Sequence, residues 1–181
     1  MNGARTFARR AGTFAILIGI AMLSYVAGVY LQARAHRDSF VPSESAPAPL
    51  VEGAAIGEVR IDRIGMRAVV SQGESDAVLR IGAGHLADTP WPGQPGNVVI
   101  AGHRDTIFRP LRNVENGDVI DLTTNVRVAH YRVVSTSTVP PTDLSVLKSS
   151  DGNTLTLITC YPFSFVGRAP ERFIVRAIEV R

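Results

Sequence analysis

The sequence predicts an all-β domain, either a closed barrel or a sandwich, preceded by one transmembrane helix. Strand-like runs outnumber helical ones and lack the spacing of βαβ units, which argues against an α/β fold. Sixteen glycines and eleven prolines among 181 residues indicate many turns, and 45% of the residues are apolar, too many for a disordered chain. Residues 11–32 carry no charge. These features indicate a membrane anchor followed by one folded domain.

Residues 11–32 are long enough to cross a membrane as a helix, because a rise of about 1.5 Å per residue covers the roughly 30 Å hydrocarbon core. Arginines precede this stretch, so the positive-inside rule assigns residues 1–10 to the cytoplasm. The alternative is a cleaved signal peptide, since residues 33–35 loosely resemble an A-x-A cleavage site. The apolar stretch exceeds the usual length of a signal peptide, which favours an uncleaved, single-pass signal anchor.

Residues 33–52 predict an extracytoplasmic linker. Prolines at positions 42, 47 and 49 prevent this stretch from packing a core and favour a semi-rigid tether. The folded domain then covers residues 53–181, which is long enough to bury a core. From the charge asymmetry of the anchor, we expect this domain outside the cytoplasm.

The folded domain contains seven strand-like runs with alternating or continuous apolar residues. They cover residues 57–62, 66–71, 97–102, 118–123, 126–139, 154–160 and 172–180. Only residues 76–81 and 108–112 have the pattern of short helical turns.

Composition excludes several classes of function. The formal net charge is only +3, and the arginines near the apolar stretch indicate membrane topology instead of a basic face for nucleic acid. A single cysteine excludes an intrachain disulfide framework and a CxxC metal site. The four histidines lack close metal-ligand spacing such as HExxH. We therefore expect no cofactor, no metal and no nucleic-acid partner.

Cys160 is the first candidate for chemistry. It ends a predicted strand, and the following Tyr161-Pro162 interrupts strand pairing because proline cannot donate to a ladder. A lone cysteine is commonly a buried small apolar residue, yet an accessible thiol outside the cell is prone to oxidation, so its presence there needs a reason. A cysteine nucleophile reacts as the thiolate, and an adjacent imidazolium supplies both a counter-charge and a proton donor.

Four histidines compete for that role. His103 is the strongest candidate, because it follows the apolar run at 97–102 and opens a polar loop in which Asp105 either orients the ring or is simply solvated. His85 is a weaker candidate flanked by turn residues. His130 lies inside an alternating strand and His36 beside the membrane stretch, where a packed or solvated ring is the simpler interpretation.

Acyl transfer also needs donors for the oxyanion that develops on the scissile carbonyl. Arg172 opens the last predicted strand, and a loop joins that strand to the one ending at Cys160. Neighbouring strands joined in this way bring a guanidinium near the sulfur, where it binds an anion but cannot act as a base. Arg168 and Arg176 are rivals, and spacing alone does not separate the three arginines from solvated surface charges.

Together these segments resemble the sortases, a family of membrane-anchored cysteine transpeptidases on bacterial surfaces. Residues 154–160 (TLTLITC) match the family's TLxTC signature, and residues 97–103 (NVVIAGH) match its histidine-bearing strand. Arg172, in ERFIVRA, matches the arginine that opens the family's final strand. The segments GHRDTIFRPL and CYPF are most similar to the class D branch. The resemblance covers residues 57–180.

The resemblance implies a closed eight-stranded β-barrel with the cysteine, histidine and arginine at one end. An eighth strand is therefore expected, either at residues 88–91 or in the loop after Val139. The resemblance assigns Cys160 as nucleophile, His103 as general acid and Arg172 as the ligand of the substrate carbonyl.

The implied reaction cleaves an LPxTG-like C-terminal sorting signal through a thioester and transfers the protein to an amine. That amine comes from a peptidoglycan precursor or a pilin lysine. Thr159 is expected to help the oxyanion through its backbone, and the loop containing Pro140 and Leu144 to line the substrate groove. An ordinary proline-rich surface loop is the alternative for that segment.

Two other interpretations stay open from the residues alone. A cell-wall L,D-transpeptidase also depends on cysteine and histidine, but its cysteine has a His-Gly-Cys neighbourhood, whereas Thr159 precedes Cys160 here. A catalytically inactive barrel that serves as a surface binding or scaffold module would keep Cys160 as an inert thiol.

Overall fold

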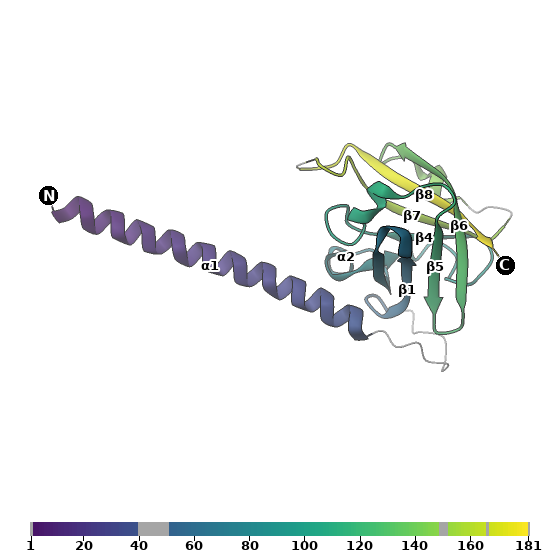
Figure 1. Cartoon of the computed structure of the whole chain (residues 1–181), viewed down its shortest axis with the longest axis horizontal. Coiled ribbons are helices and arrows are strands. Elements are labelled where there is room, and N and C mark those ends of the chain that lie inside the picture. The colour runs from purple at the N-terminus through teal and green to yellow at the C-terminus, as the bar shows by residue number, and fades with distance from the viewer. Residues whose placement is uncertain (1, 40–50, 149–151, 166, 181) are drawn as a thin grey trace.

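The computed structural model describes residues 2–39, 51–148, 152–165 and 167–180. Within these residues, eight strands close into one barrel in the order β1-β2-β3-β4-β7-β8-β6-β5 (Figure 1). The pairs β2·β3 and β4·β7 are parallel, and the other neighbours are antiparallel. The predicted closed all-β barrel is confirmed and the sandwich is excluded. The strands are β1 (Ala55–Ile61), β2 (Met66–Gln72), β3 (Ala83–His85), β4 (Asn97–Ala101), β5 (Val119–Thr124), β6 (Val128–Val139), β7 (Thr154–Tyr161) and β8 (Glu171–Val180).

Short helical segments connect the strands. The predicted helical turns are found as α2 (Asp76–Ile81) and η2 (Arg109–Asn113), while η1 (Asp62–Ile64) and η3 (Leu144–Leu147) had no clear sequence signal. Gly65 ends η1 with φ of 63°, a left-handed conformation that favours glycine, and so allows β1 to return directly as β2.

Alternate residues of each strand fill the barrel. On β6, Ala129, Tyr131 and Val133 are buried, while the residues between them are exposed. This period of two is the pattern from which the strand was predicted. The largest buried apolar side chains of the interior are Ile56, Ile61, Met66, Ile100, Phe108, Leu111, Ile120, Leu122, Tyr131, Leu155 and Leu157.

The eighth strand lies elsewhere than predicted. It is β3 (Ala83–His85), not residues 88–91 or the loop after Val139. This strand has three residues and includes a glycine, so it shows no alternation of apolar and polar residues. It exists because β2 and β4 both pair with it, a tertiary effect that local sequence does not reveal.

The N-terminal helix α1 (Asn2–Ser39) contains the predicted apolar stretch and continues beyond it at both ends. Figure 1 shows α1 as one long rod extending away from the barrel. Residues Phe14–Gln32 are apolar and long enough to cross a membrane, and none of that window is buried in the protein. This helix is therefore compatible with a single-pass anchor. Of the linker predicted at 33–52, residues 40–50 lie outside the described residues and residues 33–39 belong to α1, while the domain boundaries stay predictions.

Candidate active site

Cys160 and Arg172 face each other across the β7·β8 ladder. The two residues are direct antiparallel partners. Side chains of such partners project from the same face of a sheet, with Cβ atoms about 4.5–5.5 Å apart. The strand register therefore places a guanidinium beside the thiol, and both residues are partly exposed to solvent.

The alternation of burial shows which face this pair occupies. On β7, Leu155 and Leu157 belong to the barrel core, so the residues between them point outward. Val175 and Ala177 belong to the core on β8, which places Arg172 on the outer face as well. The thiol thus lies on the outside of the barrel wall, and its sulfur is not sealed inside the core.

His103 follows the end of β4, the strand that pairs with β7. In the parallel β4·β7 pair, Ala101 is the partner of Ile158, and the Gly102 N–H donates to the Ile158 carbonyl at 3.1 Å. One further residue along both chains leads from Gly102 to His103 and from Thr159 to Cys160. The structure therefore brings the three predicted residues to one end of three adjacent strands. Their chemical roles stay proposals.

Two contacts fix the chain that carries His103. The Thr159 hydroxyl donates to the Gly102 carbonyl at 2.7 Å, and Thr159 itself is buried. The Phe108 N–H donates to the His103 carbonyl at 3.0 Å and closes the turn. Gly102 has no room for a side chain, because a Cβ there would lie 2.8 Å from the Phe108 ring. The Thr159 side chain therefore helps to hold the segment that carries His103. This role differs from the predicted one, in which the Thr159 backbone helps to bind the oxyanion.

Aromatic rings secure the strand ends beside the thiol. Tyr161 and Phe173 stack with ring centroids 6.1 Å apart, and Phe163 meets both rings edge-on at 5.9 and 5.3 Å. Phe163 and Phe173 also pack against the core. This packing restrains the residues on either side of Cys160 and Arg172, and a site with restrained side chains is better prepared for chemistry.

Two arginines of β8 donate to main-chain carbonyls. Arg172 donates to the Glu171 carbonyl at 3.1 Å, and Arg176 donates to the Val146 carbonyl at 3.2 Å. Neither forms an ion pair with a described carboxylate. Of the three candidate arginines, Arg172 is the partner of Cys160, Arg176 is the partner of Thr156, and Arg168 is an exposed loop residue. The choice of Arg172 for the chemistry stays a prediction.

The loop between β6 and β7 is attached to the same outer face. Asn97 is fully buried, and its side-chain amide donates to the carbonyls of Val146 at 3.0 Å and Lys148 at 3.2 Å. This loop contains Pro140 and Leu144, both exposed, as a groove-lining role requires. Their contact with a substrate stays a prediction.

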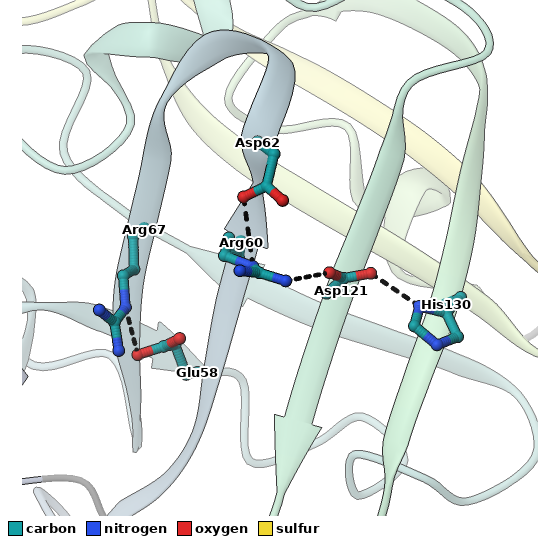
Figure 2. A network of polar contacts seen from close by, with 6 residues as sticks. All are labelled: Glu58, Arg60, Asp62, Arg67, Asp121 and His130. Atoms are coloured by element: carbon teal, nitrogen blue, oxygen red, sulfur yellow. Dashed lines mark hydrogen bonds and ion pairs between the residues drawn. The ribbon is translucent and has the colours of Figure 1, made fainter.

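His85 and His130 have structural partners. His85 is buried in β3, not in a turn, and its ring nitrogens lie 2.9 Å from Gln72 Oε1 and 3.0 Å from the Pro90 carbonyl. Burial lowers the pKa of His85 and favours its neutral ring. His130 is exposed on β6 and pairs with Asp121 at 2.7 Å (Figure 2). Asp105, the possible partner of His103, is exposed, and no hydrogen bond between the two is found in the described part of the chain.

A model of the sortase domain matches residues 59–180. The chain belongs to the sortase family. Over 124 residues the chain is 36% identical to Sortase D of Bacillus subtilis (strain 168), a match that covers 68% of this chain and 63% of that protein. Over 111 residues it is 32% identical to Sortase A of Listeria monocytogenes, covering 59% of this chain and 50% of that protein. The chain thus spans less than two thirds of the length of these curated relatives.

The fold of this sortase domain is also similar to solved structures. A Sortase D5 transpeptidase of Clostridium perfringens superimposes with a TM-score of 0.65 at 32% identity, covering 72% of this chain and 82% of that one. These similarities agree with the resemblance seen in the sequence, including its class D character.

Proposed function

We propose that the protein is a membrane-anchored cysteine transpeptidase that joins proteins bearing an LPxTG-like C-terminal signal to an amine at the cell surface. The observation that carries this proposal is the register of three strands. It sets Cys160 opposite Arg172 on the outer face of a sortase barrel, and it pairs β7 in parallel with β4, the strand that ends two residues before His103. A thiol, an imidazole and a permanent cation in this arrangement are the groups that acyl transfer through a thioester needs.

In the first half-reaction, the Cys160 thiolate attacks the carbonyl carbon of the Thr–Gly bond in the sorting signal. Arg172 donates to the carbonyl oxygen as negative charge develops on it. The tetrahedral intermediate collapses when the C–N bond breaks, and the His103 imidazolium gives its proton to the departing amine. The products are a thioester on Cys160 and a free C-terminal peptide.

In the second half-reaction, an amine attacks the thioester carbonyl. The neutral His103 accepts a proton from the attacking amine, an amide bond forms, and the thiolate leaves. The proton acquired by His103 restores the starting state. Because the cycle requires a deprotonated thiol together with a protonated imidazole, the transfer rate should pass through a maximum as pH is varied.

The surroundings of the site support recognition of an extended peptide. The outer face of β7 and β8 provides the floor, and the β6–β7 loop, held by Asn97 and Arg176, provides a wall that contains Pro140 and Leu144. The backbone of Thr159 is proposed to help bind the oxyanion. The acceptor amine is proposed to belong to a peptidoglycan precursor or a pilin lysine, with α1 holding the enzyme in the membrane and residues 1–10 in the cytoplasm.

The proposal is tested with the full-length chain in detergent, a library of LPxTG-type pentapeptides and a small primary amine, with products sequenced by mass spectrometry. We expect amide products cut after the threonine from the wild type and none from Cys160→Ala. Absence of product for every peptide, with a thiol that alkylating reagents reach only after unfolding, would support the inactive scaffold instead.

A further inference from the structure

Arg104 connects the turn that carries His103 to the loop between β7 and β8. Its Nη2 atom donates to the main-chain carbonyls of Phe165 at 2.7 Å and Gly167 at 3.0 Å. Its guanidinium carbon lies 5.9 Å from the centre of the Phe165 ring, within cation–π range. One side chain therefore joins two segments that are distant in sequence and flank the same site.

The contact between Arg104 and the β7–β8 loop, which we call the tether, lies on one side of the Cys160 thiol. The β7–β8 loop leaves the barrel just after Cys160 and re-enters it just before Arg172. Because Arg104 follows β4, its hydrogen bonds hold the loop toward the strand that bears His103, opposite to the Arg172 side of Cys160. In the proposed mechanism, this is the side from which the leaving amine departs and the acceptor amine enters.

Arg104 also contains an unusual buried donor. Its Nη1 atom is buried and has no hydrogen-bond partner among the described residues. A buried donor without a partner is costly, because its hydration is lost and nothing replaces it, and such groups are rare in native proteins. A simple surface arginine would keep this atom in water, so the burial indicates that the guanidinium is held in place by the loop contact.

We propose that Arg104 is a positioning residue that holds the β7–β8 loop beside His103, so that an amine, and not water, resolves the thioester. Arg104 acts through the loop and through its neighbour His103 and does not contact the reacting atoms. A fixed loop restricts water and orients the amine, and small displacements of such groups carry large rate effects. The inference rests on the proposed transpeptidase function.

The test compares the wild type with Arg104→Ala, Arg104→Lys and the control Arg109→Ala, an exposed arginine of the same segment. Full-length chains in detergent react with an LPxTG-type peptide and triglycine, and the ratio of transfer to hydrolysis is measured with kcat and KM. For Arg104→Ala we expect the ratio to fall about fivefold or more and kcat about tenfold, with KM for the peptide within about twofold. Arg104→Lys should be intermediate, because an ammonium lacks the planar contact with Phe165.

Hydrogen exchange of the β7–β8 loop amides is measured on the same samples, because it needs no turnover. Faster exchange in Arg104→Ala with an unchanged melting temperature supports the tether, whether or not the wild type transfers peptide. A wild type that transfers no peptide overturns only the proposed function. Wild-type exchange together with a wild-type transfer-to-hydrolysis ratio in Arg104→Ala overturns the inference. If Arg104→Ala does not fold, Arg104→Lys and Phe165→Leu decide: lower ratios support the tether, and wild-type ratios in both overturn it.

Discussion

Two faces of the barrel use arginine in different ways. The paired wall is the outer face of β1, β2, β5 and β6, where Figure 2 shows arginines bonded to carboxylates. The site wall is the outer face of β4, β7 and β8 with the adjoining loops, where arginines donate to main-chain carbonyls. The contacts of the paired wall are Arg67–Glu58 at 2.7 Å, Arg60–Asp62 at 3.3 Å, Arg60–Asp121 at 2.8 Å and His130–Asp121 at 2.7 Å.

The charges of the paired wall neutralise one another, whereas Arg104, Arg172 and Arg176 of the site wall have no ion pair with a described carboxylate. Partly exposed ion pairs stabilise a fold only slightly, and they leave little field for an external anion. A carbonyl accepts a hydrogen bond without cancelling the charge of the guanidinium, so Arg172 remains positive beside Cys160. Glu58 and Asp62 both lie in these pairs. Among the described residues there is no group of three or more side chains suited to a metal.

The largest expected effect is a difference in the rate of transfer between variants of two histidines, His103 and His130. His103→Ala should lower transfer by about 10²–10⁴-fold, because it removes the proposed proton donor for the leaving amine. His130→Ala, on the paired wall, should transfer at the wild-type rate. Both are measured as kcat/KM with peptide and amine, together with circular dichroism to show that the fold is kept. Equal rates for the two variants would remove His103 from the site.

The next largest effect is a difference in kcat/KM between variants of two arginines, Arg172 and Arg67. Arg172→Lys should lower kcat/KM by about 10²–10³-fold, since one ammonium cannot reproduce the planar donor pair that faces the developing oxyanion. Arg67→Lys keeps a cation near Glu58 and should leave kcat/KM unchanged. Near-normal turnover by Arg172→Lys would show that the partner of Cys160 is not part of the machinery.

A smaller effect concerns stability near the start of β5. The buried Asp118 accepts hydrogen bonds from Arg63 and from the Glu115 N–H, and the bond from Arg63 lowers the pKa of Asp118. Asp118→Asn should lower the free energy of unfolding by about 1–2 kcal/mol at pH 7 and leave transfer intact.

The pH dependence of that loss has a defined sign. A carboxyl with a lowered folded-state pKa stabilises the fold above its ordinary pKa of about 3.9, and this contribution disappears as pH falls through the lower folded value. Urea unfolding should therefore show a constant difference between wild type and Asp118→Asn from pH 7 to pH 5, shrinking below about pH 4. A difference that grows on acidification contradicts this account.

The smallest effect is expected for the exposed pair in Figure 2. Partial burial raises the pKa of Asp121, but hydrogen bonds from Arg60 and His130 outweigh it, and the net shift is downward. Because Arg60 remains after His130→Ala, the free energy of unfolding should change by less than about 0.5 kcal/mol. A loss of several kcal/mol in thermal or urea unfolding would mean that the paired wall supports the fold far more than exposed pairs do.

Sequence patterns were sufficient to predict a strand where the local run of apolar residues matches the strand in the fold. The apolar runs ending at Gly102 and Cys160 predicted β4 and β7, which pair in parallel, so both runs end on the same side of the barrel. The preference for Arg172 over Arg176 came from the family motif, since spacing left them equivalent, and the β7·β8 register supplies the physical reason. Burial of His85 required the neighbours of β3, which no local pattern specifies.

Arg104 illustrates what sequence reasoning missed. It lies in the polar loop after His103, and no sequence pattern predicts its contacts, because a side chain that donates to main-chain carbonyls requires no particular residue type at its partners. Its adjacency to His103 was the one available signal. Long-range contacts of this kind depend on how two loops lie relative to each other. No local pattern in a single sequence predicts that arrangement.

The most direct test of the central claim is labelling of the native, full-length chain with a chloromethyl ketone built on an LPxT peptide, followed by mass spectrometry. An open thiol beside a free cation predicts one adduct, on Cys160, formed without denaturant, slowed in Arg172→Lys and unchanged in Arg67→Lys. Labelling only after unfolding in urea, or at equal rates in both lysine variants, would contradict it.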